Sequence, residues 1–305
     1  MQSGQKLLCA VLSLTLVVVS LKSAGGEPVE AKNSLDSALY KNLQPDQFMK
    51  SWLILGPISV FQDEKGERSE DAQKKAFASD FLAQYGGETG VKPEIGKTYK
   101  IGDKEFQWKI AHSQTDEVNL IKLCADKEFV VAYAWAEIEM PEAKTALLGI
   151  GSDDGVKVWL NGKLAHEKWI GRPLNKDDDI VPVTFQKGIN QLLLKVQNMQ
   201  GAWGFVCRML GSASVNEKLI LTAGKGDLDD LEMLLSHGAD VNATIDPGLT
   251  ALHMAKIRGR KDTVDFLLKK GADPNVPMPS KEKLADAVFN RAIKGGGLVA
   301  WRVCS

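Results

Sequence analysis

The feature that most restricts the fold of this chain is an internal repeat with a period of 33 residues. The segment GDLDDLEMLLSHGADVNA (226–243) recurs as GRKDTVDFLLKKGADPNV (259–276), with the glycines, the paired leucines and the Gly-Ala-Asp triplet at matching positions. Self-similarity at a fixed period of this size is the signature of stacked supersecondary units. We therefore predict an α-helical pair of repeats over residues 214–278, in which the leucines line the stacking face.

The segment DPGLTALHMA between the two copies resembles the Thr-Pro-Leu-His-x-Ala signature of ankyrin repeats. Four positions carry the resemblance: Thr250, Leu252, His253 and Ala255. It implies that Thr250 and His253 are structural and fix a turn by hydrogen bonds. Gly238 and Gly271 close the second helix of each copy, where a positive φ angle is needed. Ankyrin surfaces bind proteins without chemistry of their own, so the resemblance implies a protein partner.

Residues 45–211 are predicted to form a different, strand-rich domain. Short segments rich in valine, isoleucine and aromatic residues alternate there with turn residues. The expected strands are SWLILGPISV (51–60), EFQWKIAHS (105–113), EVNLIKLC (117–124), EFVVAYAWAEIEM (128–140), KTALLGIGS (144–152), VKVWLN (156–161), IVPVTF (180–185), NQLLLKVQNM (190–199) and WGFVCRML (203–210). One helix is expected over residues 69–85, with Ser69 as its cap. So many strands without intervening helices indicate an all-β antiparallel jelly-roll sandwich.

The stretch GIGSDDGVKVWLNGKLAHEKW (149–169) allows two interpretations. Asn161-Gly162 predicts a two-residue hairpin turn, because both residues tolerate positive φ angles. Alternation places Val158 on one face of the preceding strand and Trp159 on the other. Asp153 and Asp154 fit either a plain turn or a structural Ca²⁺ site, since Ca²⁺ takes six to eight oxygen ligands.

The stretches LGIGSDDGVKVWLNGKLAHE, FQKGINQLLLKVQN and WGFVCRM resemble the second half of galactose-binding-like jelly rolls of exported bacterial proteins. SWLILGPI resembles the strand that opens such modules. The resemblance spans about residues 50–210 and implies a carbohydrate ligand. Trp169, with His166 and Arg172, is the candidate sugar site, because a loop aromatic can stack on a sugar and arginine can donate a forked pair of hydrogen bonds.

Other polar and aromatic residues of this domain are expected to be structural. The acidic turn NKDDDI (175–180) is predicted to be a solvated loop, and four further tryptophans are predicted to be core: Trp108, Trp135, Trp159 and Trp203. Glu137 and Glu139 share one face of a strand, which allows a paired-carboxylate glycosidase as a third reading. A solvent-facing pair is the simpler account. GIGSDDG precedes a strand where a dinucleotide loop requires a helix, so that motif is rejected.

Charge and the N-terminus restrict the partners and the compartment. The net charge of −1 and the lack of a basic stripe argue against a nucleic-acid partner. Residues 1–25 read as a signal peptide, followed by a linker over residues 26–44, so we expect a secreted, periplasmic or cell-surface protein. An uncleaved N-terminal anchor is the alternative, and no other membrane contact is expected. In an oxidising compartment Cys124 and Cys207 can pair, or they can remain two buried thiols.

The segment 279–305 begins as an amphipathic helix and resembles the first helix of β-lactamase-like serine hydrolases. Ser280-x-x-Lys283 spells that family's nucleophile motif but lies before the first helix, where the family does not place it. Two functions therefore stay open. The first is an exported non-catalytic protein that binds carbohydrate or protein. The alternative is the accessory N-terminal portion of a secreted serine hydrolase, whose catalytic domain is missing from this chain.

Overall fold

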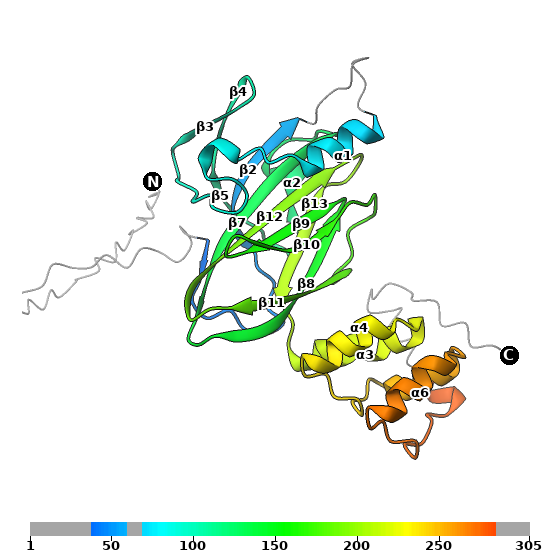
Figure 1. The fold of residues 1–305 in the computed structure, drawn as a ribbon. Helices are drawn as coiled ribbons and strands as arrows, with labels where there is room; N and C mark the ends of the chain where they lie inside the picture. Colours follow the sequence, from blue (N-terminus) through cyan, green and yellow to red (C-terminus); the bar gives the residue numbers. More distant parts are fainter. Residues whose placement is uncertain (1–37, 60–68, 285–305) are drawn as a thin grey trace, which may run out of the picture. The chain divides into compact units, whose positions relative to one another are not determined.

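The computed structural model describes residues 38–59 and 69–284, which Figure 1 draws as coloured ribbon. An antiparallel β region comes first and a short helical region follows it, as the sequence predicted. The signal peptide expected over residues 1–25 lies outside the described residues, as does most of the C-terminal segment. None of the helices in the described ranges is long and apolar enough to span a membrane.

Two antiparallel sheets make up most of the β region. The larger has the strand order β10-β9-β12-β7-β2-β5, with β1 added in parallel to β7, and the smaller has the order β11-β8-β13-β6. A separate hairpin joins β3 to β4. The strand bounds are β1 (Leu39–Tyr40), β2 (Ser51–Ser59), β3 (Thr98–Ile101), β4 (Lys104–Gln107), β5 (Lys109–His112), β6 (Val118–Asn119), β7 (Val130–Met140), β8 (Lys144–Asp153), β9 (Val156–Leu160), β10 (Lys163–Lys168), β11 (Asp179–Phe185), β12 (Gly188–Asn198) and β13 (Gly204–Met209).

One hydrophobic core lies between the two sheets. Trp52 of β2 meets Phe205 of β13 edge to face, with 5.1 Å between their ring centroids. The four tryptophans expected in the core are buried, with exposed fractions of 1% for Trp108, 8% for Trp135, 4% for Trp159 and 1% for Trp203. That prediction is confirmed. Burial of such large rings contributes strongly to folding, because hydrophobic stabilisation scales with the apolar area removed from water.

The stretch 149–169 contains the hairpin expected from its turn residues. Asn161 and Gly162 have φ angles of 51° and 76° and join β9 to β10. A Cβ atom at position 162 would lie 2.1 Å from the carbonyl oxygen of Thr89, so only glycine fits there. Both faces of β9 are buried, not one, because helix α1 (Glu70–Ala78) covers its outer face: Lys157 lies over the ring of Phe77.

Three local predictions were wrong. The single strand expected over residues 105–113 is divided at Trp108 into β4, which pairs with β3, and β5, which pairs with β2. Residues 117–124 form the short strand β6 and then helix α2 (Leu120–Leu123), because the Asn119 side chain accepts the N–H of Lys122 and caps a turn. The single helix expected over residues 69–85 is split into α1 and the 3₁₀ helix η1 (Ala83–Tyr85). The carboxylate of Asp80 accepts the N–H groups of Leu82 and Glu88, which favours a loop over continued helix.

Cys124 and Cys207 are both free thiols, so the disulfide left open by the sequence is not formed. Burial raises the pKa of Cys124 to about 11 and also raises the pKa of Cys207. The Sγ atom of Cys207 lies 3.7 Å from the sulfur of Met49 in the core. Both thiols therefore behave as small hydrophobic side chains with little thiolate character at neutral pH.

The helical region consists of two helix pairs at the predicted period. Its helices are α3 (Ser212–Lys225), α4 (Leu228–Ser236), α5 (Ala251–Ile257) and α6 (Lys261–Lys269). Thr250 and His253 form a reciprocal cap at the start of α5, and Nε2 of His253 lies 3.0 Å from the carbonyl oxygen of Val276. Gly238 and Gly271 follow α4 and α6 with φ angles of 90° and 94°. Both glycines therefore occupy the left-handed backbone region in which side chains are strained.

The stacking face of α6 can be tested with two adjacent leucines. Leu267 is fully buried, whereas Leu268 is 41% exposed. We expect Leu267→Ala to lose about 2–5 kcal/mol of unfolding free energy, because it leaves a cavity in the core. Leu268→Ala is the matched control, expected to lose less than about 1 kcal/mol. Urea unfolding followed by circular dichroism measures both. Equal losses would show that the helix face is wrongly assigned.

Candidate ligand-binding site

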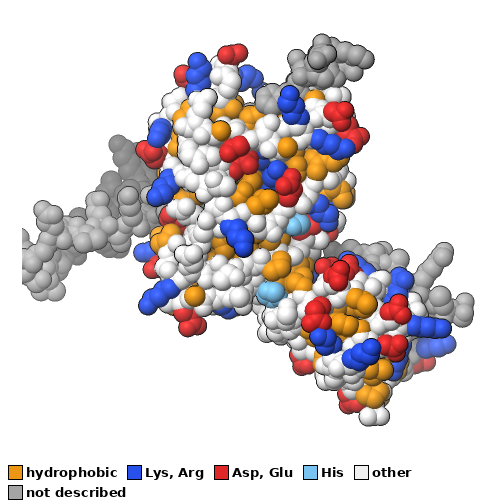
Figure 2. Space-filling view, viewed as in Figure 1, with side chains coloured by type: hydrophobic (Ala, Val, Ile, Leu, Met, Phe, Trp, Pro, Cys, Tyr) orange, Lys and Arg blue, Asp and Glu red, His pale blue; other side chains and the backbone are white. Residues whose placement is uncertain are grey.

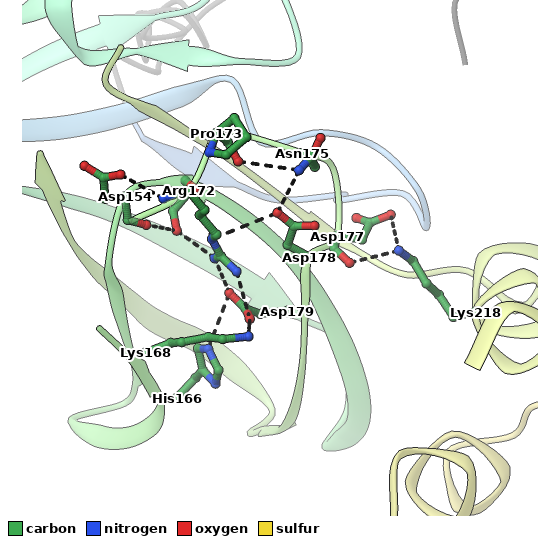
Figure 3. A network of polar contacts seen from close by, with 11 residues as sticks. Asp154, His166, Lys168, Arg172, Pro173, Asn175, Asp177, Asp178, Asp179 and Lys218 are labelled. Carbon is green, nitrogen blue, oxygen red and sulfur yellow. Dashed lines mark hydrogen bonds and ion pairs between the residues drawn. The ribbon is translucent and has the colours of Figure 1, made fainter. Parts of the chain in front are cut away.

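The candidate sugar site of the sequence lies in a polar network around Asp179, at the start of β11 (Figure 3). The Asp179 side chain is 2% exposed, and Lys168 lies 3.0 Å from one of its oxygens. Nε2 of His166 lies 3.5 Å from the other oxygen. Burial by itself raises the pKa of Asp179, but the His166, Arg172 and Lys168 side chains beside its carboxylate outweigh burial and leave that pKa well below its ordinary value.

Arg172 is the main partner of Asp179. Its guanidinium donates to both carboxylate oxygens of Asp179. It also donates to Ser152: Nε lies 3.2 Å from the carbonyl oxygen, and Nη2 lies 2.8 Å from the hydroxyl oxygen. The Arg172 side chain is only 10% exposed. The forked donor expected to contact a sugar is therefore engaged within the protein, where it ties the β10–β11 loop to the end of β8. A ligand role for Arg172 stays a prediction.

Trp169 lies beside this network but contacts a different element. Lys74 of α1 places its Nζ atom 4.7 Å from the centroid of the Trp169 ring. The ring is half-buried, so that lysine covers part of the surface on which a sugar was expected to stack. The structure thus brings His166 and Arg172 together through Asp179 and places Trp169 against α1. Neither Asp179 nor Lys74 was identified from the sequence.

Asp153 and Asp154 occupy the β8–β9 turn. The carboxylate of Asp154 accepts the backbone N–H groups of Arg172 at 2.9 Å and Met199 at 2.6 Å, so it joins three segments of the sandwich. Asp153 is also buried, and burial, followed by the neighbouring Asp154, raises its pKa to about 6. Among the described residues no group of three or more His, Cys, Asp or Glu side chains is arranged to hold a metal ion. The Ca²⁺ site stays a prediction.

The raised pKa of Asp153 predicts a pH-dependent effect on stability. A carboxyl whose folded pKa exceeds its unfolded value stabilises the fold below the unfolded pKa of about 3.9, and this contribution is lost as pH rises through the folded pKa. That folded value is about 6. Asp153→Asn should therefore gain stability over wild type as pH rises from 4 to 7, by about 1 kcal/mol after solvent screening.

Urea midpoints of Asp153→Asn and wild type, measured at several pH values, give this difference directly. Asp126→Asn, the same substitution at an exposed position, is the control variant and is compared with wild type over the same pH range. A difference between Asp153→Asn and wild type that stays constant from pH 4 to pH 7 would contradict the assignment.

The acidic turn 175–180 differs from its predicted solvated state. Asp177 is 6% exposed and Asp179 is 4% exposed. Asp177 accepts hydrogen bonds from Arg208 of β13, and its carbonyl oxygen accepts one from Lys218 of α3 at 2.8 Å (Figure 3). Burial lowers the pKa of Lys218, although Asp177 acts in the opposite direction. The prediction was wrong for these two aspartates, whose partners lie on elements distant in sequence.

A second polar cluster lies beneath α1 and was missed altogether. Lys195 of β12 is fully buried, and its Nζ donates to the carbonyl oxygens of Ala76 (3.1 Å), Phe77 (2.9 Å) and Ser79 (2.5 Å). The same atom lies 3.1 Å from a carboxylate oxygen of Glu88, which also accepts the hydroxyl of Tyr133 at 2.6 Å.

Burial dominates the electrostatics of this cluster. It lowers the pKa of Lys195 to about 8, although the Glu88 carboxylate acts in the opposite direction. It also raises the pKa of Glu88. The ammonium group still carries a proton at neutral pH, where it satisfies the carbonyl groups at the end of α1. The cluster therefore joins α1 and the following loop to the larger sheet.

The carboxylate pair and the serine-x-x-lysine segment considered in the sequence lie outside the Asp179 network and the Lys195 cluster. Glu137 is half-buried on β7, where burial raises its pKa, and Glu139 is exposed on the same strand. The hydroxyl of Ser280 accepts the backbone N–H of Lys283 at 3.3 Å. Ser280 thus acts as a helix cap in the serine-x-x-lysine segment, because its oxygen satisfies an N–H group at the helix start.

Comparisons with known proteins support the assignment of the helical region to ankyrin repeats. Residues 192–278 match the family model of ankyrin repeats in three copies, and the match begins within β12. The mouse 2-5A-dependent ribonuclease is 46% identical over 61 residues, which cover 20% of this chain and 8% of that protein. The L-asparaginase of Dirofilaria immitis is 33% identical over 97 residues, or 32% of this chain and 16% of the enzyme. Myotrophin of Xenopus tropicalis is 37% identical over 58 residues, or 19% of this chain and 49% of myotrophin.

The chain spans less than half the length of each of these relatives, so their similarity concerns a part of each protein. The matched residues include all four helices α3 to α6 and the cap formed by Thr250 and His253. The chain therefore carries ankyrin repeats after an antiparallel β-rich region, and such repeats indicate a protein partner.

Proposed function

We propose that this chain is an exported, non-catalytic binding protein whose ankyrin repeats hold a protein partner. The protein partner is supported by the apolar side chains that are exposed on the repeats. Ile257 and Leu268 are each 41% exposed, and Leu228 is 37% exposed. Figure 2 shows hydrophobic side chains between charged ones over the helical region. Mixed surfaces of this kind suit protein–protein contact, in which apolar anchors are surrounded by a polar rim.

For the β region we propose carbohydrate binding. The sequence resemblance of residues 50–210 supports it, together with the two-sheet architecture. Trp169, His166 and Arg172 were the first candidates for this ligand. The engagement of Arg172 by Asp179 and of Trp169 by Lys74 favours a different location for the sugar.

A photo-cross-linking experiment on the full chain tests the protein partner. A cross-linking amino acid replaces Ile257, Leu268 or, as a matched control, Ile95, which is 63% exposed in the β region. We expect the same protein to be captured from both repeat positions and not from position 95. The purified partner should then bind Ile257→Lys/Leu268→Lys at least about tenfold more weakly than wild type, because a buried apolar anchor is lost. Unchanged affinity would exclude this surface.

A further inference from the structure

A pocket of about 380 Å³ lies between η1, the end of β2 and the β3–β4 hairpin. The rings of Phe81 and Phe106 line it, together with the polar side chains of Gln84 and Asp103. We infer that this pocket binds a neutral mono- or disaccharide, with the sugar against the two phenylalanines. The inference rests on the proposed carbohydrate binding of the β region and moves its site away from Trp169.

The hairpin presents one face to this pocket. In its register Tyr99 pairs with Phe106 and Ile101 pairs with Lys104, so these four side chains share a face. Tyr99 is 1% exposed and anchors the hairpin, whereas Ile101, Lys104 and Phe106 line the pocket. The alternation of the strands therefore places an aromatic ring and a charged donor on the same wall.

Tyr85 joins the two walls of the pocket. The hydroxyl of Tyr85 in η1 accepts the N–H of Lys100 at 2.6 Å and donates to its carbonyl oxygen at 3.2 Å. The Tyr85 and Tyr99 ring centroids lie 4.7 Å apart, and Tyr99 meets Trp108 edge to face at 6.3 Å. A preformed site loses little conformational entropy when a ligand binds.

The position of Phe81 is fixed by the buried cluster below it. Nζ of Lys195 lies 5.0 Å from the centroid of the Phe81 ring, and the backbone N–H of Phe81 donates to the hydroxyl of Tyr133 at 3.3 Å. The neighbouring Asp80 binds two backbone N–H groups through its two oxygens. The polar cluster that closes α1 thus also holds an aromatic wall of the pocket.

The chemistry of the lining selects the ligand class. Lys100 and Lys104 are balanced by Asp80 and Asp103, so the pocket has no surplus charge for a phosphate or a cation. Its aromatic rings suit the C–H faces of a pyranose, while Gln84, Asp103 and the lysines offer donors and acceptors to hydroxyl groups. The volume falls near the lower end of small-molecule sites, which run from roughly 300 to 1,000 Å³.

Calorimetric titration of the full chain tests the inference with galactose, glucose, N-acetylglucosamine, lactose and cellobiose, and with adenosine as a competing aromatic ligand. We expect one of the sugars to bind and Phe106→Ala to raise its Kd about tenfold. Ala83→Leu is a second variant, because Ala83 is exposed at the pocket and a larger side chain there fills it without touching the core. It should raise Kd to at least a similar extent. Glu142→Ala, at an exposed position in the β7–β8 turn outside the pocket lining, should leave Kd unchanged.

The outcomes separate this inference from the proposal on which it rests. If a sugar binds but Phe106→Ala and Ala83→Leu leave its Kd unchanged, the inferred site is wrong and carbohydrate binding stands. If Trp169→Ala alone abolishes binding, the site lies at the Trp169 network. If none of the sugars binds, or only adenosine does, the inference and the carbohydrate proposal both fail, whereas the ankyrin partner is unaffected.

Discussion

Lys195→Met is expected to lose about 3–5 kcal/mol of unfolding free energy, because it removes one partner of a buried charged pair. Methionine has a similar length but cannot donate to the three carbonyl oxygens at the C-terminal end of α1, and it leaves the Glu88 carboxylate without its cation. The loss should be visible as a lower urea midpoint with an unchanged slope. Because Phe81 lies over the same ammonium group, sugar binding should weaken as well.

Lys157→Met is the matched control for this experiment. Lys157 pairs with Lys195 across neighbouring strands β9 and β12, and its Nζ lies 3.0 Å from Glu167, whose side chain is 44% exposed. After Lys157→Met the Glu167 carboxylate is still hydrated by solvent, so a loss of only about 1 kcal/mol of unfolding free energy is expected. Similar losses of unfolding free energy in Lys195→Met and Lys157→Met would mean that the buried pair of Lys195 and Glu88 stabilises the fold no more than an exposed pair does.

Asp179→Asn is expected to lose a comparable amount, about 3–5 kcal/mol at pH 7, because Arg172 would remain buried without its counter-charge. The effect should depend on pH with a defined sign. The pKa of Asp179 is lowered in the fold, so its stabilisation is present above the unfolded pKa of about 3.9 and is lost as pH falls toward the folded value. The difference between Asp179→Asn and wild type should therefore shrink in acid.

Asp178→Asn controls for a general effect of charge in this loop. Its carboxylate lies 4.0 Å from Nε of Arg172, and its side chain is 28% exposed. We expect a loss below about 1 kcal/mol, as for other solvent-accessible pairs. A larger loss for Asp178→Asn than for Asp179→Asn, measured by urea unfolding at pH 7, would contradict the network in Figure 3.

The parts of the fold that the sequence predicted depend on local signals. Asn161-Gly162 favours a turn by its own backbone preferences, and the cap joins Thr250 and His253, which are only three positions apart. The 33-residue period repeats the same local pattern twice, which makes the ankyrin helices visible without any knowledge of tertiary contacts. Most short strands could be predicted for the same reason. The predicted strand over residues 117–124 and the predicted helix over residues 69–85 were wrong where Asn119 and Asp80 bind nearby backbone groups.

The buried polar networks were missed because their partners are distant in the chain. Lys195 and Glu88 are 107 residues apart, and nothing in the alternation of β12 shows that α1 covers that lysine. Asp177 and Asp179 sit in an acidic run that is typical of a solvated turn, yet Arg208 and Arg172 neutralise them inside the fold. Burial of charge is a tertiary property, because it depends on which elements pack together.

The most direct test of the account is hydrogen–deuterium exchange of the full chain with and without the captured protein partner. Slowed exchange should be concentrated in residues 212–278, where the ankyrin helices present Ile257 and Leu268. Protection confined to the β region, residues 39–209, with exchange in α3 to α6 unchanged, would contradict it.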